Sequence, residues 1–172
     1  MTRRSRYPLL IGLVAAERVA ELVVSQRNLA WSRAQGGKEF GAGHYPVMVA
    51  LHTGLLAGCL AEAARLRRAP SRRVTGPALV AVVLAQVLRW WCITTLGRQW
   101  NTRVVVIPGA ARVARGPYRL IPHPNYVAVV AEGVALPLAG GAWITAAVFS
   151  LLNAALLRTR ISVENTALES LE

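Results

Sequence analysis

Two apolar runs in the middle of this chain are long enough to cross a lipid bilayer. They span Tyr45–Leu66 and Pro77–Leu96, and a helix needs about 20 such residues to cross the hydrocarbon core. Three shorter apolar segments are Pro8–Val24, Asn125–Ala139 and Ala142–Leu157. Because an apolar segment in lipid must satisfy its own backbone, these runs predict helices. We therefore expect an all-α membrane bundle of about five transmembrane helices.

The composition agrees with a membrane protein of one domain, covering residues 1–172. The chain is 54% hydrophobic and only 16% charged, whereas soluble domains carry about 25% charged residues. The net charge of +12 comes from basic residues that cluster between the apolar segments. Such clusters are typical of contacts with lipid headgroups. We therefore expect membrane lipids as partners and exclude nucleic acid.

The segments between the apolar runs are polar. We expect loops at Ser25–His44, Arg65–Arg73 and Gly97–Pro124, the last being the longest. Within it, Arg103–Ile107 is rich in β-branched residues and predicts an extended strand. The tail Ile161–Glu172 alternates apolar and acidic residues, which predicts a short amphipathic C-terminal helix on the cytosolic side, lying on the bundle.

One polar motif lies immediately before the fourth apolar segment. The residues from Gly116 to Tyr126 read GPYRLIPHPNY, a Gly-Pro turn followed by aromatic rings, a guanidinium and an imidazole. Groups of this kind cost free energy near lipid unless they bind something. The motif is therefore the strongest candidate for chemistry in the chain.

This motif resembles the isoprenylcysteine carboxyl methyltransferase family, membrane enzymes that use S-adenosylmethionine. The family pattern is roughly GPYRxVRHPxYxG, then an apolar hairpin and an R-x-x-x-E-E element. Here the two elements read GPYRLIPHPNYVA and, from Arg160 to Asn165, RISVEN. The upstream SQRN at 25–28 and GHYP at 43–46 are similar to the bacterial branch. The resemblance thus covers nearly the whole chain.

The chain departs from the family pattern at four positions. Pro122 stands where the family usually has Arg, and Ala128 replaces a common Gly. Ala110 stands where the family usually has His. Asn165 replaces the second carboxylate of the Glu pair, which leaves Glu164 as the acid of that element.

The resemblance implies a role for each matching residue, with the cofactor-binding part at about 97–172. It assigns Arg160 and Glu164 to catalysis, and Arg160 and Glu132 to binding the methyl acceptor. Arg103 falls near another cofactor-contacting position. The implied cofactor-binding set is Ala110, Arg112, Val113, Tyr118, His123, Pro124, Asn125, Tyr126 and Glu164. The pattern contains no metal-ligand cluster.

The residue types fit S-adenosylmethionine chemistry. The Glu164 carboxylate can accept hydrogen bonds from the ribose or the ammonium group, and His123 and Tyr126 can donate to the carboxylate or adenine. Aromatic rings also favour a nearby sulfonium cation. An acceptor already ionised at neutral pH needs no general base, so alignment and desolvation suffice. Arg160 would hold such an anion.

These implications predict an S-adenosylmethionine-dependent O-methyltransferase with a lipophilic small-molecule substrate. The acceptor would be a carboxylate or acidic enol, prenylcysteine-like or alkyl-pyrone-like, and would enter sideways from the bilayer. S-adenosylmethionine is a cytosolic compound. We therefore expect a multi-pass protein of the cell membrane (the inner, plasma membrane), with residues 97–124 and the tail cytoplasmic and the N-terminus outside.

Two other functions remain open from the sequence. One is a membrane reductase of the sterol-reductase type that uses a nicotinamide cofactor, and the other is a non-catalytic membrane bundle. At the residue level, Arg160 and Glu164 are four apart, so a local ion pair on one helix face is an alternative to a catalytic role.

Further polar and aromatic residues have simpler explanations. We expect hydrogen-bonding roles for His44 and His52, and an ion pair of Arg89 with Glu132 or Glu21 inside the membrane. The residues expected in an interfacial aromatic belt are Trp90, Trp91, Trp100 and Trp143. Both cysteines lie in apolar runs, where they are expected to be buried and unpaired.

Overall fold

The computed structural model describes residues 3–66 and 70–169. In these ranges the chain forms five α-helices, two short 3-10 helices and one antiparallel pair of strands. The α-helices are α1 (Arg3–Ala34), α2 (His44–Arg65), α3 (Arg72–Leu96), α4 (Pro124–Gly140) and α5 (Trp143–Glu169). The 3-10 helices are η1 (Gly97–Gln99) and η2 (Gly116–Arg119), and the strands are β1 (Lys38–Phe40) and β2 (Val104–Val106).

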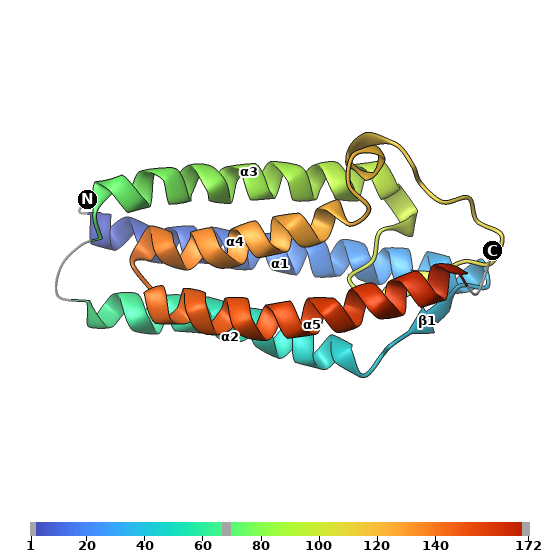
Figure 1. Cartoon of the computed structure of the whole chain (residues 1–172), viewed down its shortest axis with the longest axis horizontal. Coiled ribbons are helices and arrows are strands. Elements are labelled where there is room, and N and C mark those ends of the chain that lie inside the picture. The colour runs from blue at the N-terminus through green and yellow to red at the C-terminus, as the bar shows by residue number, and fades with distance from the viewer. Residues whose placement is uncertain (1–2, 67–69, 170–172) are drawn as a thin grey trace.

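The five helices lie alongside one another in an elongated, up-and-down bundle (Figure 1). The beginning of α1 and the α4–α5 turn lie at one end of the bundle. The β1–β2 pair, the segment 97–123 and the end of α5 lie at the other (Figure 1). We call this second end the loop end. The expected all-α bundle is therefore present.

Three of the described helices are long and apolar enough to cross a membrane, namely those at His44–Arg65, Arg72–Gln99 and Trp143–Glu169. Helix α4 has only 17 residues, fewer than the roughly 20 that a full crossing needs. Helix α1 carries Glu17, Arg18 and Glu21 along its middle. The expected five crossings are thus supported for three helices.

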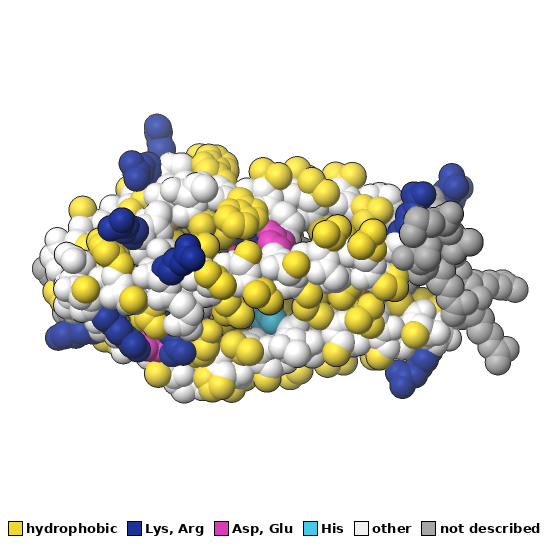
Figure 2. Space-filling view, turned by 180° about the vertical axis from the view of Figure 1, so that it is seen from behind, with side chains coloured by type: hydrophobic (Ala, Val, Ile, Leu, Met, Phe, Trp, Pro, Cys, Tyr) yellow, Lys and Arg dark blue, Asp and Glu magenta, His cyan; other side chains and the backbone are white. Residues whose placement is uncertain are grey.

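The outer surface of the bundle is suited to lipid. Large apolar side chains point outward, with Leu151 75% exposed and Leu84 61% exposed. Figure 2 shows apolar side chains along the bundle, with Lys and Arg gathered toward its two ends. Arg at the ends and apolar groups between them match a bilayer with headgroups on both sides.

Helix α1 is longer than the apolar pattern predicted. Residues 25–34, expected to begin a loop, continue the helix to Ala34. This part contains no Gly or Pro before Gly36. Its buried residues are mostly polar: Ser25, Asn28 and Ser32 are nearly inaccessible, and Leu29 is the apolar exception. A helix whose buried face is mostly polar gives little apolar signal, which explains the early predicted end.

The expected separate C-terminal helix is also not observed. Helix α5 runs without interruption from Trp143 to Glu169, so residues 161–169 continue a membrane-length helix. No Gly or Pro lies in this range to end it. The last three residues of the predicted tail lie outside the described residues.

The strand expected at 103–107 is confirmed as β2. It pairs antiparallel with β1, which the sequence did not predict, in the register Glu39 to Val105. The two last apolar segments are joined by a turn at Gly140–Gly141, where Gly141 caps α4 with a left-handed φ of 78°. Both cysteines are free and buried, as expected.

Candidate functional site

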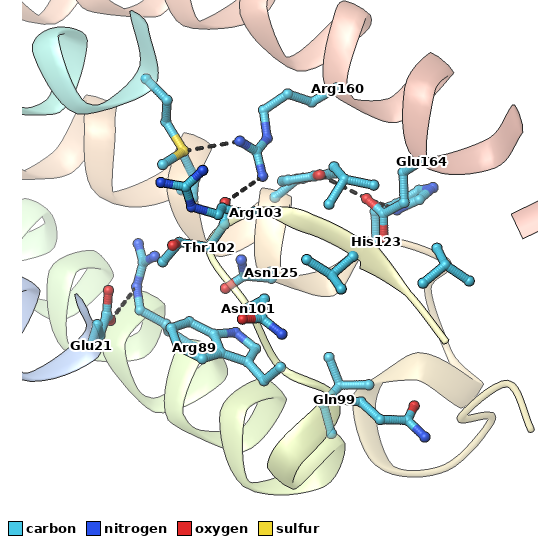
Figure 3. Close-up of a pocket in the computed structure, with 18 of the residues that line it drawn as sticks. Glu21, Arg89, Gln99, Asn101, Thr102, Arg103, His123, Asn125, Arg160 and Glu164 are labelled. Atoms are coloured by element: carbon cyan, nitrogen blue, oxygen red, sulfur yellow. Dashed lines mark hydrogen bonds and ion pairs between the residues drawn. The ribbon is translucent and has the colours of Figure 1, made fainter. Parts of the chain in front are cut away.

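A cavity of about 670 Å³ opens into the bundle from the loop end. Ligand pockets in proteins commonly measure about 300–1,000 Å³. Figure 3 shows side chains from several elements pointing into this space, among them Arg89 from α3, His123 and Asn125 at the start of α4, and Arg160 from α5. The cavity is therefore the candidate site.

The GPYR…HPNY motif forms one wall of the cavity. Gly116 has a φ of 57°, and a Cβ there would lie 2.7 Å from Thr95 Oγ1. Only glycine fits this turn against α3 without strain. The chain then forms η2 and returns through His123, the residue before α4, which Pro124 begins. These constraints place Tyr118 and Tyr126 on the cavity.

Three side chains of this wall and of α5 form a cluster. The Tyr126 hydroxyl donates to Glu164 Oε2 at 2.7 Å. His123 Nδ1 lies 3.6 Å from the same oxygen, and its Nε2 lies 3.2 Å from Asn165 Oδ1. The rings of His123 and Tyr126 stack at 5.5 Å. The acid of the second sequence element therefore meets the imidazole of the first, as the resemblance implied.

Arg160 is buried beside this cluster. It is 6% exposed, and its guanidinium donates to Thr102 O at 2.8 Å and contacts Met48 Sδ at 3.2 Å. It lies 5.9 Å from the ring of Tyr126. Among the described residues no carboxylate pairs with it. The alternative of a local Arg160–Glu164 ion pair is therefore wrong.

The polar face of α1 holds the next wall in place. Asn28 Nδ2 donates to the carbonyl of Trp100 at 2.7 Å and to that of Gly97 at 3.1 Å. The hydroxyls of Ser25 and Thr102 are 2.8 Å apart. These bonds fix the segment that carries Thr102, whose carbonyl in turn receives Arg160.

Arg103 closes the cavity at β2. Its guanidinium donates to Glu39 Oε1 at 2.6 Å and lies 3.9 Å from the ring centre of Tyr45. Glu39 also pairs with Arg33 at 3.2 Å. Burial alone would raise the pKa of Glu39, but the hydrogen bonds and charges of Arg103 and Arg33 outweigh burial and lower it.

Tyr118 lines the same cavity as a neutral phenol. Burial, together with the nearby Cys92 thiol, raises its pKa far above the ordinary value. Because the phenol keeps its proton, it can donate a hydrogen bond to a ligand across the physiological pH range.

Several buried polar atoms around the cavity have no hydrogen-bond partner in the described structure. They belong to the cavity-lining residues Trp100, Asn101, Arg103, Asn125, Asn153 and Arg160. Leaving such an atom unpaired costs about 1–3 kcal/mol. A concentration of them around one cavity indicates a polar ligand.

The cavity collects most of the residues that the sequence assigned to the site. Nine of them line it: Ala110, Arg112, Val113, Tyr118, His123, Asn125, Tyr126, Arg160 and Glu164. Pro124 does not line it, because this residue is fully buried as the first residue of α4. Its position determines how α4 begins, and it offers no contact to a ligand.

Glu132 does not line the cavity either. It is 4% exposed and accepts hydrogen bonds from both Arg18 and Arg89, at 2.5 Å from Arg89 Nη2. Glu21 completes the group, with Arg18 at 2.5 Å and Arg89 at 3.5 Å. Both expected partners of Arg89 are thus confirmed. Both guanidinium groups bond to the same oxygen, Oε2, and the side chain is buried outside the cavity lining. Glu132 is therefore not placed for the predicted contact with the acceptor.

Two expectations for histidine and tryptophan need comment. His52 Nδ1 bonds the carbonyl of Met48 at 2.9 Å, as expected, whereas neither ring nitrogen of His44 has a partner in the described residues. Trp100 is 3% exposed and lines the cavity, so it does not belong to an interfacial belt. The residues Trp90, Trp91 and Trp143 are exposed on the surface.

The sequence did not identify several residues of the cavity. The chief ones are Arg18, Met48, His52, Trp100, Asn101 and Asn153. Asn153 carried a usable signal, since an amide inside an otherwise apolar run is costly without a partner. The others contribute only through the way α1, α2 and the segment 97–113 fold together.

The comparisons with known proteins agree with this geometry. Residues 78–170 match the model of the isoprenylcysteine carboxyl methyltransferase (ICMT) family, a range that contains the GPYR…HPNY motif, Arg160 and Glu164. The chain belongs to this family. It is also 38% identical over 162 residues to the uncharacterized protein YpbQ of Bacillus subtilis (strain 168), covering 94% of this chain and 95% of that protein. No solved structure matches.

Family membership and the three apolar helices together make the chain a membrane protein of a methyltransferase family. The matched region includes α3 from residue 78 onward, the segment 97–123, α4 and α5. It therefore contains the motif wall, Arg103 and Arg160, whereas α1 and α2 lie outside it.

Proposed function

We propose that the protein is an S-adenosylmethionine-dependent O-methyltransferase that acts on a lipophilic acceptor with an anionic oxygen, a carboxylate or an acidic enol. One observation carries this proposal. A single cavity joins the cluster of His123, Tyr126 and Glu164 to a buried guanidinium, Arg160, that has no carboxylate partner among the described residues.

The cofactor half of the cavity would be the motif wall. The residues there fit S-adenosylmethionine on three counts: a carboxylate at Glu164, a stacked pair of rings at His123 and Tyr126, and unpaired amide oxygens at Asn101 and Asn125. The amides and the carboxylate suit the adenine, ribose and ammonium groups. The rings suit a sulfonium cation.

The acceptor half would centre on Arg160. When bound, S-adenosylmethionine supplies a methyl group on a sulfonium, which passes to the acceptor oxygen as the S–C bond breaks and an O–C bond forms. Arg160 would hold that oxygen, because a buried cation without a counter-ion favours an anion strongly. Since such an acceptor is already ionised, the site needs no general base. Burial excludes water from the reacting oxygen.

The location follows from the cofactor. S-adenosylmethionine is a cytosolic compound, so the loop end would face the cytoplasm of the cell and the beginning of α1 the opposite side. A lipophilic acceptor would reach the cavity from the bilayer, since the cavity extends among apolar side chains such as Val49 and Leu56 of α2. In this arrangement all five helices would cross or enter the membrane.

Calorimetry with S-adenosylhomocysteine on the purified full chain tests the proposal. We expect the wild type to bind, and Glu164→Gln to weaken binding at least about tenfold, because a hydrogen bond to a charged group is worth about 1.5–3 kcal/mol. Glu169→Gln is the matched control: an exposed acid on the same helix that does not line the cavity. Absence of binding by the wild type would refute the cofactor assignment.

A further inference from the structure

One buried amide in the cavity has no partner and no role in the proposed reaction. Asn153 of α5 is 2% exposed, and its amide oxygen Oδ1 is buried without a hydrogen-bond partner in the described structure. It lines the cavity on the same face of α5 as Arg160, about two helical turns deeper in the bundle. A polar side chain inside a membrane helix costs free energy, and one without a partner indicates a binding role.

A second polar group faces the same depth from α2. His52 lines the cavity, and its Nδ1 lies 2.9 Å from the carbonyl oxygen of Met48. A carbonyl oxygen only accepts, so Nδ1 carries the proton and Nε2 is left as an acceptor. Among the described residues Nε2 has no hydrogen-bond partner. Nε2 of His52 is therefore available to accept a hydrogen bond from a ligand.

The contacts between α2 and α5 bring these two groups to one level. Met48 Sδ touches the guanidinium of Arg160 at 3.2 Å. One turn further along α2, the His52 ring meets the ring of Phe149 at 5.4 Å. Asn153 lies between Phe149 and Arg160 on the buried face of α5. It therefore lies across from His52. The backbone of Arg160 is two turns away, but its guanidinium reaches back to Met48, which is one turn from His52 on α2. Asn153 thus lies roughly one helical pitch of 5.4 Å below the guanidinium.

Around these polar groups the walls of the deep part of the cavity are largely apolar. Val49, Leu56, Leu156 and Leu157 line it. Its far side is the charged group of Arg18, Glu21 and Arg89, whose charges are already paired with one another and with Glu132. The Asn153 amide oxygen and the Nε2 atom of His52 thus have no hydrogen-bond partner among the described residues and lie within reach of an acceptor held at Arg160.

We propose that Asn153 and His52 form a subsite for a hydroxyl group of the acceptor, about one helical turn deeper than the anionic oxygen at Arg160. Rotation of the Asn153 amide exchanges the positions of its oxygen and its NH₂ group. A hydroxyl can then accept from Asn153 Nδ2 while it donates to His52 Nε2, which no carbonyl or carboxylate can do. The substrate class is then an amphiphilic anion whose polar part carries a second, neutral oxygen. This inference rests on the proposed function for the role of Arg160.

Three fatty acids of equal chain length test the subsite. They are hexadecanoate, 6-hydroxyhexadecanoate, whose hydroxyl can reach the subsite, and 16-hydroxyhexadecanoate, whose hydroxyl is at the far end. Each is titrated into the full chain in nanodiscs loaded with S-adenosylhomocysteine, with empty nanodiscs as the blank. We expect the 6-hydroxy acid to bind about tenfold more tightly than the other two, the value of one or two net hydrogen bonds.

Variants separate recognition from packing. Asn153→Leu keeps the side-chain volume and should abolish the tenfold preference while leaving hexadecanoate binding unchanged. His52→Phe should reduce the preference as well. Ser150→Ala, a polar-to-apolar change on α5 outside the cavity lining, should retain it. Arg160→Gln should weaken all three acids alike.

The outcomes distinguish the two proposals. Equal binding of the three acids by the wild type, or no binding of any, would overturn the subsite. The subsite would also be overturned if Asn153→Leu bound all three acids more weakly by the same factor, because a packing defect has that effect. S-adenosylhomocysteine binding, measured on the same samples, should be the same in Asn153→Leu and wild type. If the wild type does not bind S-adenosylhomocysteine, the proposed function is overturned instead.

Discussion

Arg160 and Glu164 show how little spacing alone says about a pair of residues. They lie four apart on α5, yet the guanidinium contacts Thr102 and Met48 while the carboxylate accepts from Tyr126. An exposed i,i+4 pair would be worth about 0.3–0.5 kcal/mol. Here each charged group is directed into the cavity, where it is available to a ligand.

The departures from the family pattern are also understood at this scale. Asn165, in the place of a second acid, lies 3.2 Å from His123 Nε2. The imidazole thus meets one carboxylate and one amide, so a hydrogen-bonding partner is retained where a charge is lost. Pro122 lines the cavity in the place of the usual Arg, so no guanidinium enters the site from this position.

Glu39 gives a pH-dependent prediction. Its pKa is lowered in the folded protein, so its stabilisation is present above the unfolded-state value of about 4.3 and is lost as the pH falls through the folded-state value. Glu39→Gln should lower the melting temperature at pH 7 by about 2–4 °C. The difference from wild type should shrink as the sample is acidified. A difference that stays constant down to the lowest pH would contradict this.

At the scale of elements, α1 changes the character of its buried face along its length. Near its start it buries Ile11 and Val14, in the middle Glu21, and near its end Asn28 and Ser32. The first part packs in the hydrophobic core, the middle joins the charged group with α3 and α4, and the last part binds the segment 97–102. One helix therefore connects the membrane core to the loop end.

Removing one carboxylate from the charged group should lower the stability of the protein strongly, and a second substitution in the group should restore part of it. Glu132→Leu leaves Arg18 and Arg89 with one carboxylate fewer, and an uncompensated buried charge costs about 3–5 kcal/mol. Adding Arg89→Met restores the balance, because Arg18 and Glu21 still pair. The double variant should therefore unfold at a higher temperature than Glu132→Leu in the same detergent. A double variant that is less stable than the single one would show that the group does not act as a unit.

At the scale of the whole molecule, the bundle has two chemically different ends. The loop end carries the cavity, both strands and the motif wall, while the other end carries the α4–α5 turn and the beginnings of α1 and α3. The basic residues do not distinguish the ends, because Arg side chains lie toward both (Figure 2). The position of the cavity is what distinguishes them.

Topology reporters test the proposed orientation. A fluorescent protein fused after Glu172 should fluoresce in a bacterial host, because the proposed orientation puts the loop end in the cytoplasm. Alkaline phosphatase fused at Pro70, after truncation of the rest, should be active outside the membrane. Reversed results from both fusions would place the cavity on the side without S-adenosylmethionine and would contradict the proposed location.

The sequence alone determined the helical class, the cores of the five helices and the pairing of two motif elements. An apolar segment in lipid must satisfy its own backbone hydrogen bonds, which a helix does. A Gly-Pro turn followed by HPNY allows few backbone conformations. The strand at 104–106 could be predicted for the same reason, since β-branched residues favour an extended backbone. These are properties of short segments.

The tertiary structure alone decided how far α1 and α5 extend, that Arg18 joins the pairing of Arg89 with Glu132, and which further residues reach the cavity. The ends of both helices bury polar groups such as Asn28 and Arg160, whose partners lie on segments distant in the sequence. Apolar periodicity cannot detect a polar interface. A buried charge or amide is stable only when a partner compensates the cost of burial, and these partners come together only when the whole bundle folds.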